Sequence, residues 1–175
     1  MVNIRNLRRA PLFKIIKICY KSLSMEKTLF YESGLNFSCK RCSACCRYEP
    51  GFVFLSEEDL KKLENALNLD RKSLLAVYCR WVTDWKGDES LSLKEKSNKD
   101  CILWDNGCTV YNERPFQCVS FPFWESIVVS KEAWKNTGTG CPGIGSGTLY
   151  SKEAVSEFLR LRLSQPVIKK IGGET

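Results

Sequence analysis

Leucines recur at helical spacing in the segment that follows residue 56. The run Ser56–Asp59 places a hydroxyl ahead of three acidic residues, which is typical of a capping box at the start of a helix. Leu60, Leu63 and Leu67 then fall on one face of that helix. The pattern therefore predicts an amphipathic helix that begins after residue 56 and ends near residue 68.

Two more helices are indicated by a capping residue that precedes a periodic apolar pattern. Asp70 can cap a helix over residues 71–81, whose apolar side chains would face a core. Ser151 can cap a final helix over residues 152–163. The chain beyond that helix has no periodic pattern, so residues 166–175 are expected to form a flexible tail.

Three short apolar runs predict β-strands, at residues 52–55, 91–93 and 127–129. Two further runs flank Asn106-Gly107, a dipeptide that readily adopts the positive φ values of a tight turn, so residues 101–111 are expected to form a β-hairpin. The predicted fold class is α+β: a small single domain with short β-hairpins and three or more helices.

The size of the chain agrees with a single domain. It has 175 residues, of which 43% are hydrophobic and 27% are charged, an ordinary globular composition. No stretch reaches the roughly 20 consecutive apolar residues of a transmembrane helix. The sequence divides into a leader at residues 1–24, a cysteine-rich body at residues 25–165 and the tail.

The net charge of +7 belongs almost entirely to the leader, because residues 1–24 hold six basic residues and no acidic one. The body is close to neutral, so no specific nucleic-acid partner is expected. Apolar residues and lysines in the leader have the spacing of a basic amphipathic helix. Three interpretations are open: weak contact with a membrane surface through residues 1–24, a helix docked on the body, or an upstream extension ahead of a true start at Met25. A secretory signal is disfavoured because lysines interrupt the apolar run, and a cytoplasmic location is expected.

The most unusual feature of the composition is ten cysteines with no histidine. The absence of histidine excludes a Ser-His-Asp triad, a Cys-His dyad, mixed Cys/His zinc fingers and haem ligation through histidine. Any transition-metal chemistry must therefore use mainly thiolates. Cys19 and Cys79 stand apart from the other cysteines, and a single cysteine is often a small buried hydrophobe. That interpretation is favoured for Cys19 and is left open for Cys79.

Four of the cysteines are densely spaced, in the pattern Cys39-x-x-Cys42-x-x-Cys45-Cys46. A C-x-x-C pair places two thiolates on one tight turn, and three cysteines at this spacing match the start of the bacterial ferredoxin pattern. Adjacent Cys45 and Cys46 are expected to point in different directions, so that they could serve two sites. Disulfides are disfavoured because the chain has no secretory signal and is long enough to fold without them.

Four stretches of the body form a specific combination of motifs: CKRCSACC at 39–46, GFVFLS at 51–56, GCTVYNERPFQCVSFP at 107–122 and CPGIG at 141–145. Through them the chain resembles the CxxCxxCC family of zinc- or iron-chelating cysteine-cluster proteins. The resemblance implies that eight cysteines are associated with metal: Cys39, Cys42, Cys45, Cys46, Cys101, Cys108, Cys118 and Cys141. The family usually has a basic residue directly after the cysteine of the R-P-x-x-C segment, where this chain has Val119.

The cysteine pattern and the resemblance favour a metal-binding protein that folds around an all-cysteine cluster. The cofactor is expected to be zinc or iron, with a [4Fe–4S] cluster as one form of the iron. Eight cysteines suffice for two four-thiolate sites, Cys39, Cys42, Cys45 and Cys141 for one and Cys46, Cys101, Cys108 and Cys118 for the other. Four thiolates around a divalent ion carry a net charge of about −2. Nearby basic residues could offset that charge: Lys40, Arg41, Arg47, Arg80 and Arg114.

Two other classes of function are weighed against metal binding alone. An iron–sulfur or thiol-dependent redox or group-transfer enzyme would need an open site, and the glycines at 143–147 lack the spacing of a nucleotide-binding loop. A zinc-stabilised adaptor for protein or nucleic acid is less favoured, because the body is nearly neutral. The expected partner is a metal ion or cluster, and no protein partner is indicated.

Overall fold

The computed structural model describes residues 29–170 of the chain. The leader at residues 1–24 and the alternative start at Met25 lie outside the described residues, as do residues 171–175. The elements follow in chain order: β1 (Leu35–Phe37), the 3-10 helix η1 (Ala44–Cys46), α2 (Glu57–Leu67), α3 (Arg71–Tyr78), β2 (Cys79–Thr83), β3 (Glu89–Leu93), the 3-10 helix η2 (Tyr111–Glu113), α4 (Phe116–Ser120), α5 (Glu125–Val128), α6 (Lys131–Gly140), β4 (Thr148–Tyr150) and α7 (Lys152–Ser164).

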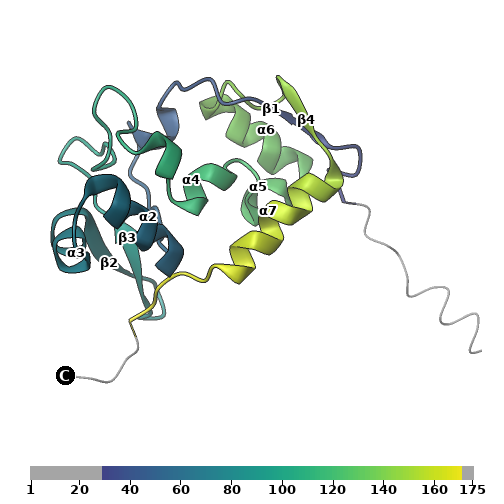
Figure 1. Cartoon of the computed structure of the whole chain (residues 1–175). Coiled ribbons are helices and arrows are strands. Elements are labelled where there is room, and N and C mark those ends of the chain that lie inside the picture. The colour runs from purple at the N-terminus through teal and green to yellow at the C-terminus, as the bar shows by residue number, and fades with distance from the viewer. Residues whose placement is uncertain (1–28, 171–175) are drawn as a thin grey trace, which may run out of the picture.

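The elements form two groups on either side of α4 (Figure 1). One group contains α2, α3 and the β2–β3 hairpin, and the other contains the β1–β4 pair with α5, α6 and α7. Each group buries its own hydrophobic core. The first core consists of Leu55, Leu60, Leu63, Leu74, Cys79, Leu91, Leu93, Leu103 and Val110. The second consists of Tyr31, Leu35, Phe37, Phe123, Ile127, Val128, Trp134 and Val155. The fold class is α+β, as predicted.

The start of α2 confirms the capping box that the sequence predicts. The Ser56 main-chain N–H donates to Asp59 Oδ2 at 2.9 Å, and the Asp59 N–H donates back to Ser56 Oγ at 3.2 Å. Both residues are fully buried. Asp59 also accepts the N–H of Phe116 at 2.7 Å, so the same carboxylate that caps α2 holds the start of α4. The helix ends at Asn68, whose φ of 51° is left-handed.

The second predicted helix is shorter than expected. Asp70 caps it as predicted, accepting the N–H of Ser73 at 2.8 Å. The helix ends at Tyr78, however, and Cys79–Thr83 forms β2, which pairs antiparallel with β3 from Cys79↔Leu93 to Thr83↔Glu89. The prediction of helix to residue 81 is wrong there, because pairing with β3 satisfies the backbone and the β-branched and aromatic residues suit a strand.

The apolar run at 127–129 is helical and not a strand. The N–H groups of Ile127 and Val128 both donate to the carbonyl oxygen of Trp124, at 2.8 and 2.9 Å, and α5 covers Glu125–Val128. Ile127 and Val128 are buried in the second core. A short apolar run is equally compatible with a buried strand and with a buried helical turn. The strand prediction for 127–129, which rested on composition, is therefore wrong.

The predicted strand at 91–93 is confirmed as part of β3. The predicted strands at 52–55 and within 101–111 are reduced to isolated bridges. The 52–55 run contributes one bridge, Phe54↔Ser92, and the 101–111 segment contributes Trp104↔Cys108 around its turn. Asn106 and Gly107 have the positive φ values expected of that turn, 49° and 146°. The predicted hairpin at 101–111 is therefore a tight turn with almost no strand. The hairpin that does form is β2–β3.

The sequence did not predict the pairing of β1 with β4, two strands that lie far apart in the sequence. Leu35 lies opposite Tyr150 and Phe37 lies opposite Thr148. The predicted final helix is confirmed by α7, where Ser151 Oγ accepts the N–H of Ala154 at 3.3 Å. Because α7 follows β4 directly, the β1–β4 pair fixes one end of this helix.

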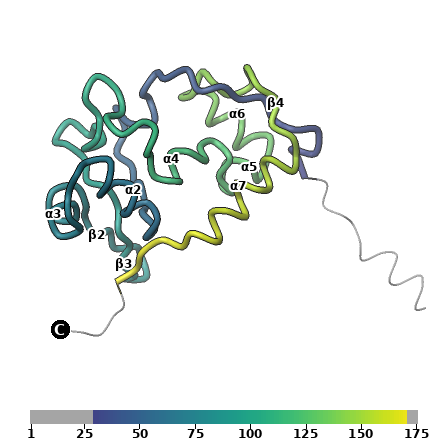
Figure 2. The backbone as a smooth tube through the Cα atoms, viewed as in Figure 1, coloured from purple at the N-terminus to yellow at the C-terminus, as the bar shows by residue number. Residues whose placement is uncertain are grey.

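The segment after α7 crosses from the second group to the first (Figure 2). Ile168 donates its N–H to the Leu55 carbonyl at 2.9 Å and accepts the N–H of Leu91 at 2.9 Å, and Lys170 donates to Glu89. Residues 168 and 170 of the predicted flexible tail are therefore bonded to the first group, where Leu55 and β3 offer unpaired backbone groups, and residues 171–175 of that tail lie outside the described residues. Among the residues that the structure describes, no helix is long and apolar enough to cross a membrane.

Candidate metal centre

Eight of the nine cysteines in the described range lie on four segments of the chain. The segment after β1, which ends in η1, carries Cys39, Cys42, Cys45 and Cys46; the segment after β3 carries Cys101 and Cys108; α4 carries Cys118; and Cys141 directly follows α6. All of these thiols are free. They are the same eight that the sequence singled out.

The segments of Cys39 and Cys141 are joined through their backbones. The N–H of Ser38 donates to the Gly143 carbonyl at 3.1 Å, and the N–H of Gly145 donates to Asn36 O at 2.9 Å. A Cβ on Gly143 would come within 2.4 Å of the Ser38 carbonyl oxygen. Only glycine permits this close approach, which gives the Cys-Pro-Gly sequence its structural role.

The 39–46 segment is wound tightly by left-handed residues that are not glycine. Arg41 has a φ of 52° and Ser43 a φ of 62°, and such conformations in non-glycine residues are uncommon and concentrate at functional sites. The winding brings Cys45 Sγ within 3.7 Å of Cys46 Sγ. The expectation that these adjacent cysteines point in different directions is therefore wrong.

Cys101 is held against η1 by a main-chain hydrogen bond, in which its N–H donates to the Cys46 carbonyl at 2.8 Å. The Cys101 carbonyl in turn accepts the N–H of Trp104 at 2.9 Å, and Trp104 forms a bridge with Cys108. This chain of contacts places Cys101 and Cys108 on the same tight turn beside Cys46.

Electrostatic coupling shows which other thiols lie near one another. Burial raises the pKa of the Cys118 thiol, and Cys101, Cys45 and Cys108 raise it further. Burial also raises the pKa of Cys141, and Cys42 and Cys45 add to that shift. Cys45 is thus coupled to thiols on both sides of the cluster, which makes it the central residue.

The pKa values of the two thiols in the Cys45–Cys46 pair are shifted in opposite directions. A hydrogen bond from Cys46 lowers the pKa of Cys45 to about 6, with a smaller contribution from the Arg114 charge. The same hydrogen bond raises the pKa of Cys46, and burial raises it further. The contact therefore favours one thiolate and one thiol in the pair over two ionised groups.

Cys79 belongs to the first hydrophobic core and not to the cluster. Its side chain is buried on β2, and burial raises the pKa of its thiol to about 11. A thiol in this environment behaves as a small apolar side chain. This resolves the question that the sequence left open for Cys79, while Cys19 lies outside the described residues.

Guanidinium groups stack on aromatic rings around the thiols. Arg114 Cζ lies 3.7 Å from the centre of the Tyr111 ring, and Arg41 Cζ lies 4.4 Å from the same ring. Arg47 Cζ lies 3.9 Å from the Trp104 ring centre. Sequence reasoning missed these rings, although both stand within three residues of a predicted ligand or of a basic residue.

The basic residues differ in how far their charge is available to the thiols. Arg47 pairs with buried Asp100 at 3.2 Å, and Arg80 pairs with Glu95 at 2.7 Å. Arg114 has a buried Nε with no partner among residues 29–170, and its charge lowers the pKa of Cys45 and of Cys118. Arg114 is therefore the basic residue that acts most directly on the cluster, and Asp100 is a buried anchor that the sequence did not reveal.

The donor set fits a thiophilic metal. As the side chains lie, no three Cys, Asp or Glu residues within 29–170 form a group that could hold a metal ion. The atoms that converge here are nevertheless thiols, the ligands that zinc and iron–sulfur centres use, and the adjacent acid Asp100 is already paired. Metal sites of this kind commonly close only when the ion binds, because thiols must first lose their protons.

A small α+β domain with eight free thiols on four segments, several of them electrostatically coupled, is typical of a cysteine-rich metal-chelating domain. Comparison with known families gives the same class: residues 38–142 match the family described as "CxxCxxCC: Putative zinc- or iron-chelating domain". The chain belongs to this CxxCxxCC family. No solved structure matches the chain.

Proposed function

We propose that this protein binds zinc or iron through two all-cysteine sites. The observation that carries the proposal is the position of Cys45, which is coupled to Cys46, Cys101 and Cys118 on one side and to Cys141 on the other. Cysteines that served only as small buried hydrophobic side chains would not be expected to lie near one shared cysteine from four separate segments.

The two sites are proposed to divide the thiols between them. Cys46, Cys101, Cys108 and Cys118 form the first set, supported by the Cys101–Cys46 hydrogen bond and the Trp104↔Cys108 bridge. Cys39, Cys42, Cys45 and Cys141 form the second set, supported by the Ser38–Gly143 hydrogen bond and the coupling of Cys42 to Cys141.

The metal would join segments that have little regular structure of their own. Most of the eight cysteines lie on loops or on helices of three to five residues. A four-thiolate zinc site holds such segments together without further chemistry, whereas an iron–sulfur cluster would add the capacity to exchange electrons. Arg114 contributes in either case, because its positive charge stabilises the thiolate form of Cys45 and Cys118.

A thiol-dependent redox enzyme is the second candidate, and one observation favours it. Cys45 Sγ lies 3.7 Å from the Cys46 thiol, and the hydrogen bond between them lowers the pKa of Cys45 to about 6. Low-pKa thiolates are the reactive form of cysteine. Either function requires reduced thiols, so we propose that the protein works in the cytoplasm.

The test is anaerobic purification of the full chain, followed by elemental analysis, acid-labile sulfide determination and a visible spectrum. A colourless protein with about two zinc ions per chain supports two closed zinc sites. A brown protein with iron and sulfide supports an iron–sulfur cluster. A metal-free protein that reduces a disulfide substrate would favour the redox candidate, and a metal-free protein without that activity would overturn both.

A further inference from the structure

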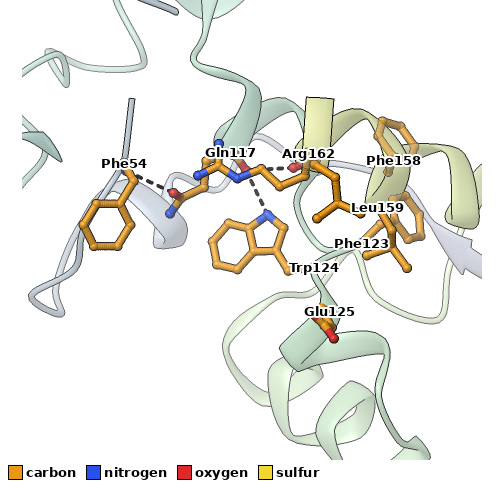
Figure 3. A pocket seen from close by; sticks show the side chains of 10 residues that line it. Phe54, Gln117, Phe123, Trp124, Glu125, Phe158, Leu159 and Arg162 are labelled. Carbon is orange, nitrogen blue, oxygen red and sulfur yellow. Dashed lines mark hydrogen bonds between the residues drawn. The ribbon is translucent and has the colours of Figure 1, made fainter. Parts of the chain in front are cut away.

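A pocket of about 590 Å³ lies between α4, the turn after it, and α7 (Figure 3). Its size falls within the range of small-molecule sites. The walls are mainly aromatic and aliphatic, formed by Phe54, Phe123, Trp124, Phe158 and Leu159. Leu163 on the rim is 83% exposed, so the pocket opens to solvent along α7.

Gln117 is a polar residue of the pocket, and its groups are already used. Its Oε1 accepts the N–H of Phe54 at 3.0 Å and its Nε2 donates to the Phe52 carbonyl at 2.7 Å. Its main-chain carbonyl accepts Trp124 Nε1 at 3.0 Å. These bonds fix the walls of the pocket and use one of the two Nε2 donors and one of the two Oε1 lone pairs of the Gln117 amide.

Arg162 is different, because it brings an unmatched donor to the pocket. Its Nη1 is buried and has no hydrogen-bond partner among residues 29–170. Burial lowers the pKa of the Arg162 guanidinium, and Asp59 opposes that shift only in part. A buried charged donor without a partner is costly, which points to an acceptor that is missing.

The charge of that missing acceptor follows from what faces Arg162. The charge of Asp59 reaches Arg162, but its carboxylate oxygens already accept from Ser56 and Phe116. Glu125 also lines the pocket, but it is exposed, and Figure 3 shows it apart from Arg162, on the other side of Trp124. A guanidinium presents several N–H donors and no acceptor, so its partner must accept hydrogen bonds and is best negatively charged. The walls require the remainder of the partner to be apolar.

We propose that this pocket binds a small organic carboxylate with an aromatic or branched apolar body, whose carboxylate accepts from Arg162. This site is separate from the thiols, although α4 contributes to both through Gln117 and Cys118. The ligand would bury its apolar body against Phe123, Phe158 and Leu159.

The test uses two probes that differ in one group, naphthalene-1-acetate and the neutral naphthalene-1-acetamide, titrated calorimetrically into the full chain as purified. The wild type should bind the acetate roughly 10–100-fold more tightly than the amide, since only the acetate makes a charge-assisted hydrogen bond. Arg162→Gln should abolish this preference and leave amide binding unchanged, while Arg162→Lys should retain part of it.

The matched control is Arg160→Gln, because Arg160 lies on the same helix but is exposed and paired with Glu157 at 2.7 Å. Its binding should equal that of the wild type. Equal affinity for the two probes, binding of neither, or the same loss in both arginine variants would overturn the proposal.

Discussion

The main-chain N–H of Cys101 donates to the carbonyl oxygen of Cys46 at 2.8 Å. This bond fixes the segment after β3 against η1, and it does so through the backbone, independently of any metal. The backbones of the two segments are therefore joined by a bond that involves no thiol. Changes to the thiols can then be tested without removing this contact, which is the basis of the predictions on the cluster.

Cys42→Ser should lower the metal content of the purified protein, because Cys42 is a thiol of the second proposed site. Cys79→Ala is the matched control: it removes a buried thiol that lies in the hydrophobic core, so metal content should stay at the wild-type value. The control should instead lower the free energy of unfolding by about 1 kcal/mol, the usual order for a small core truncation. Elemental analysis and urea unfolding measure the two effects, and equal metal loss in both variants would contradict the assignment of the ligands.

Gly143→Ala should also reduce metal content, although no thiol is changed. Its new Cβ would meet the Ser38 carbonyl at 2.4 Å and push the Cys141 loop away from the Cys39 loop. Gly140→Ala is the control, since a Cβ there has nothing within 4 Å. Metal content per chain, compared at equal protein concentration, should fall only in the Gly143 variant. Retention of full metal by Gly143→Ala would show that the contact of these loops is dispensable.

Arg114→Gln should weaken metal binding without removing a ligand. Arg114 stacks on Tyr111 and lowers the pKa of Cys45 and Cys118, so its loss makes these thiols harder to deprotonate. Outer groups of this kind typically change metal affinity by roughly 10–100-fold. Competition with a chelator at several pH values measures the effect. Arg160→Gln, on an exposed and paired arginine, should leave the chelator competition unchanged.

Glu95→Gln should reduce the dependence of stability on acid pH. The Gly51 N–H and then Arg80 lower the pKa of Glu95 below its usual 4.5, so the folded state favours the carboxylate. Its stabilisation is therefore complete above pH 4.5 and is lost as the pH falls through the lowered pKa. The variant should be less stable at pH 7, and the difference from wild type should shrink as the pH falls from about 5 to 3. A difference that is constant over this range would exclude the linkage.

Ser56→Ala should destabilise the fold by about 1 kcal/mol, the usual cost of losing an N-cap. Asp59→Ala should cost more, because it leaves the buried N–H of Phe116 without its acceptor at the start of α4. Thermal and urea unfolding would rank the two variants. The reverse order would mean that Asp59 does not hold α4 in place.

The sequence predicted best where one local signal decides the outcome. Ser56 and Ser151 carry their own capping geometry, so α2 and α7 were found with nearly correct ends. The failures came where distant partners decide. Cys79 joins a strand because Leu93 lies beside it, and Ile127 is helical because no strand pairs with it in the described chain. Hydrophobic periodicity does not show which distant segment will lie beside Cys79 or beside Ile127.

The candidate site divides in the same way. Its eight cysteines are proposed as ligands from spacing and resemblance, because ligand type is a property of the residue itself. The rings of Tyr111 and Trp104, and the anchoring of Arg47 by Asp100, depend on which loops fold together. The direction of the Cys45 and Cys46 thiols was predicted wrongly, because the left-handed turn at Ser43 is not visible in the residue types.

The side-chain amide of Gln117 makes two hydrogen bonds that the backbone of a neighbouring strand would otherwise make. Its Oε1 accepts the N–H of Phe54, and its Nε2 donates to the carbonyl of Phe52. The next residue along α4 is Cys118, one of the proposed ligands. A shift of that cysteine on metal loss would therefore loosen the hydrogen bonds of Phe52 and Phe54 to Gln117, whereas the N–H of Val53 still donates to Ser92 Oγ at 3.1 Å. Amide hydrogen exchange at Phe54 should therefore become faster when metal is lost. It would report metal occupancy from a residue that is not a proposed metal ligand.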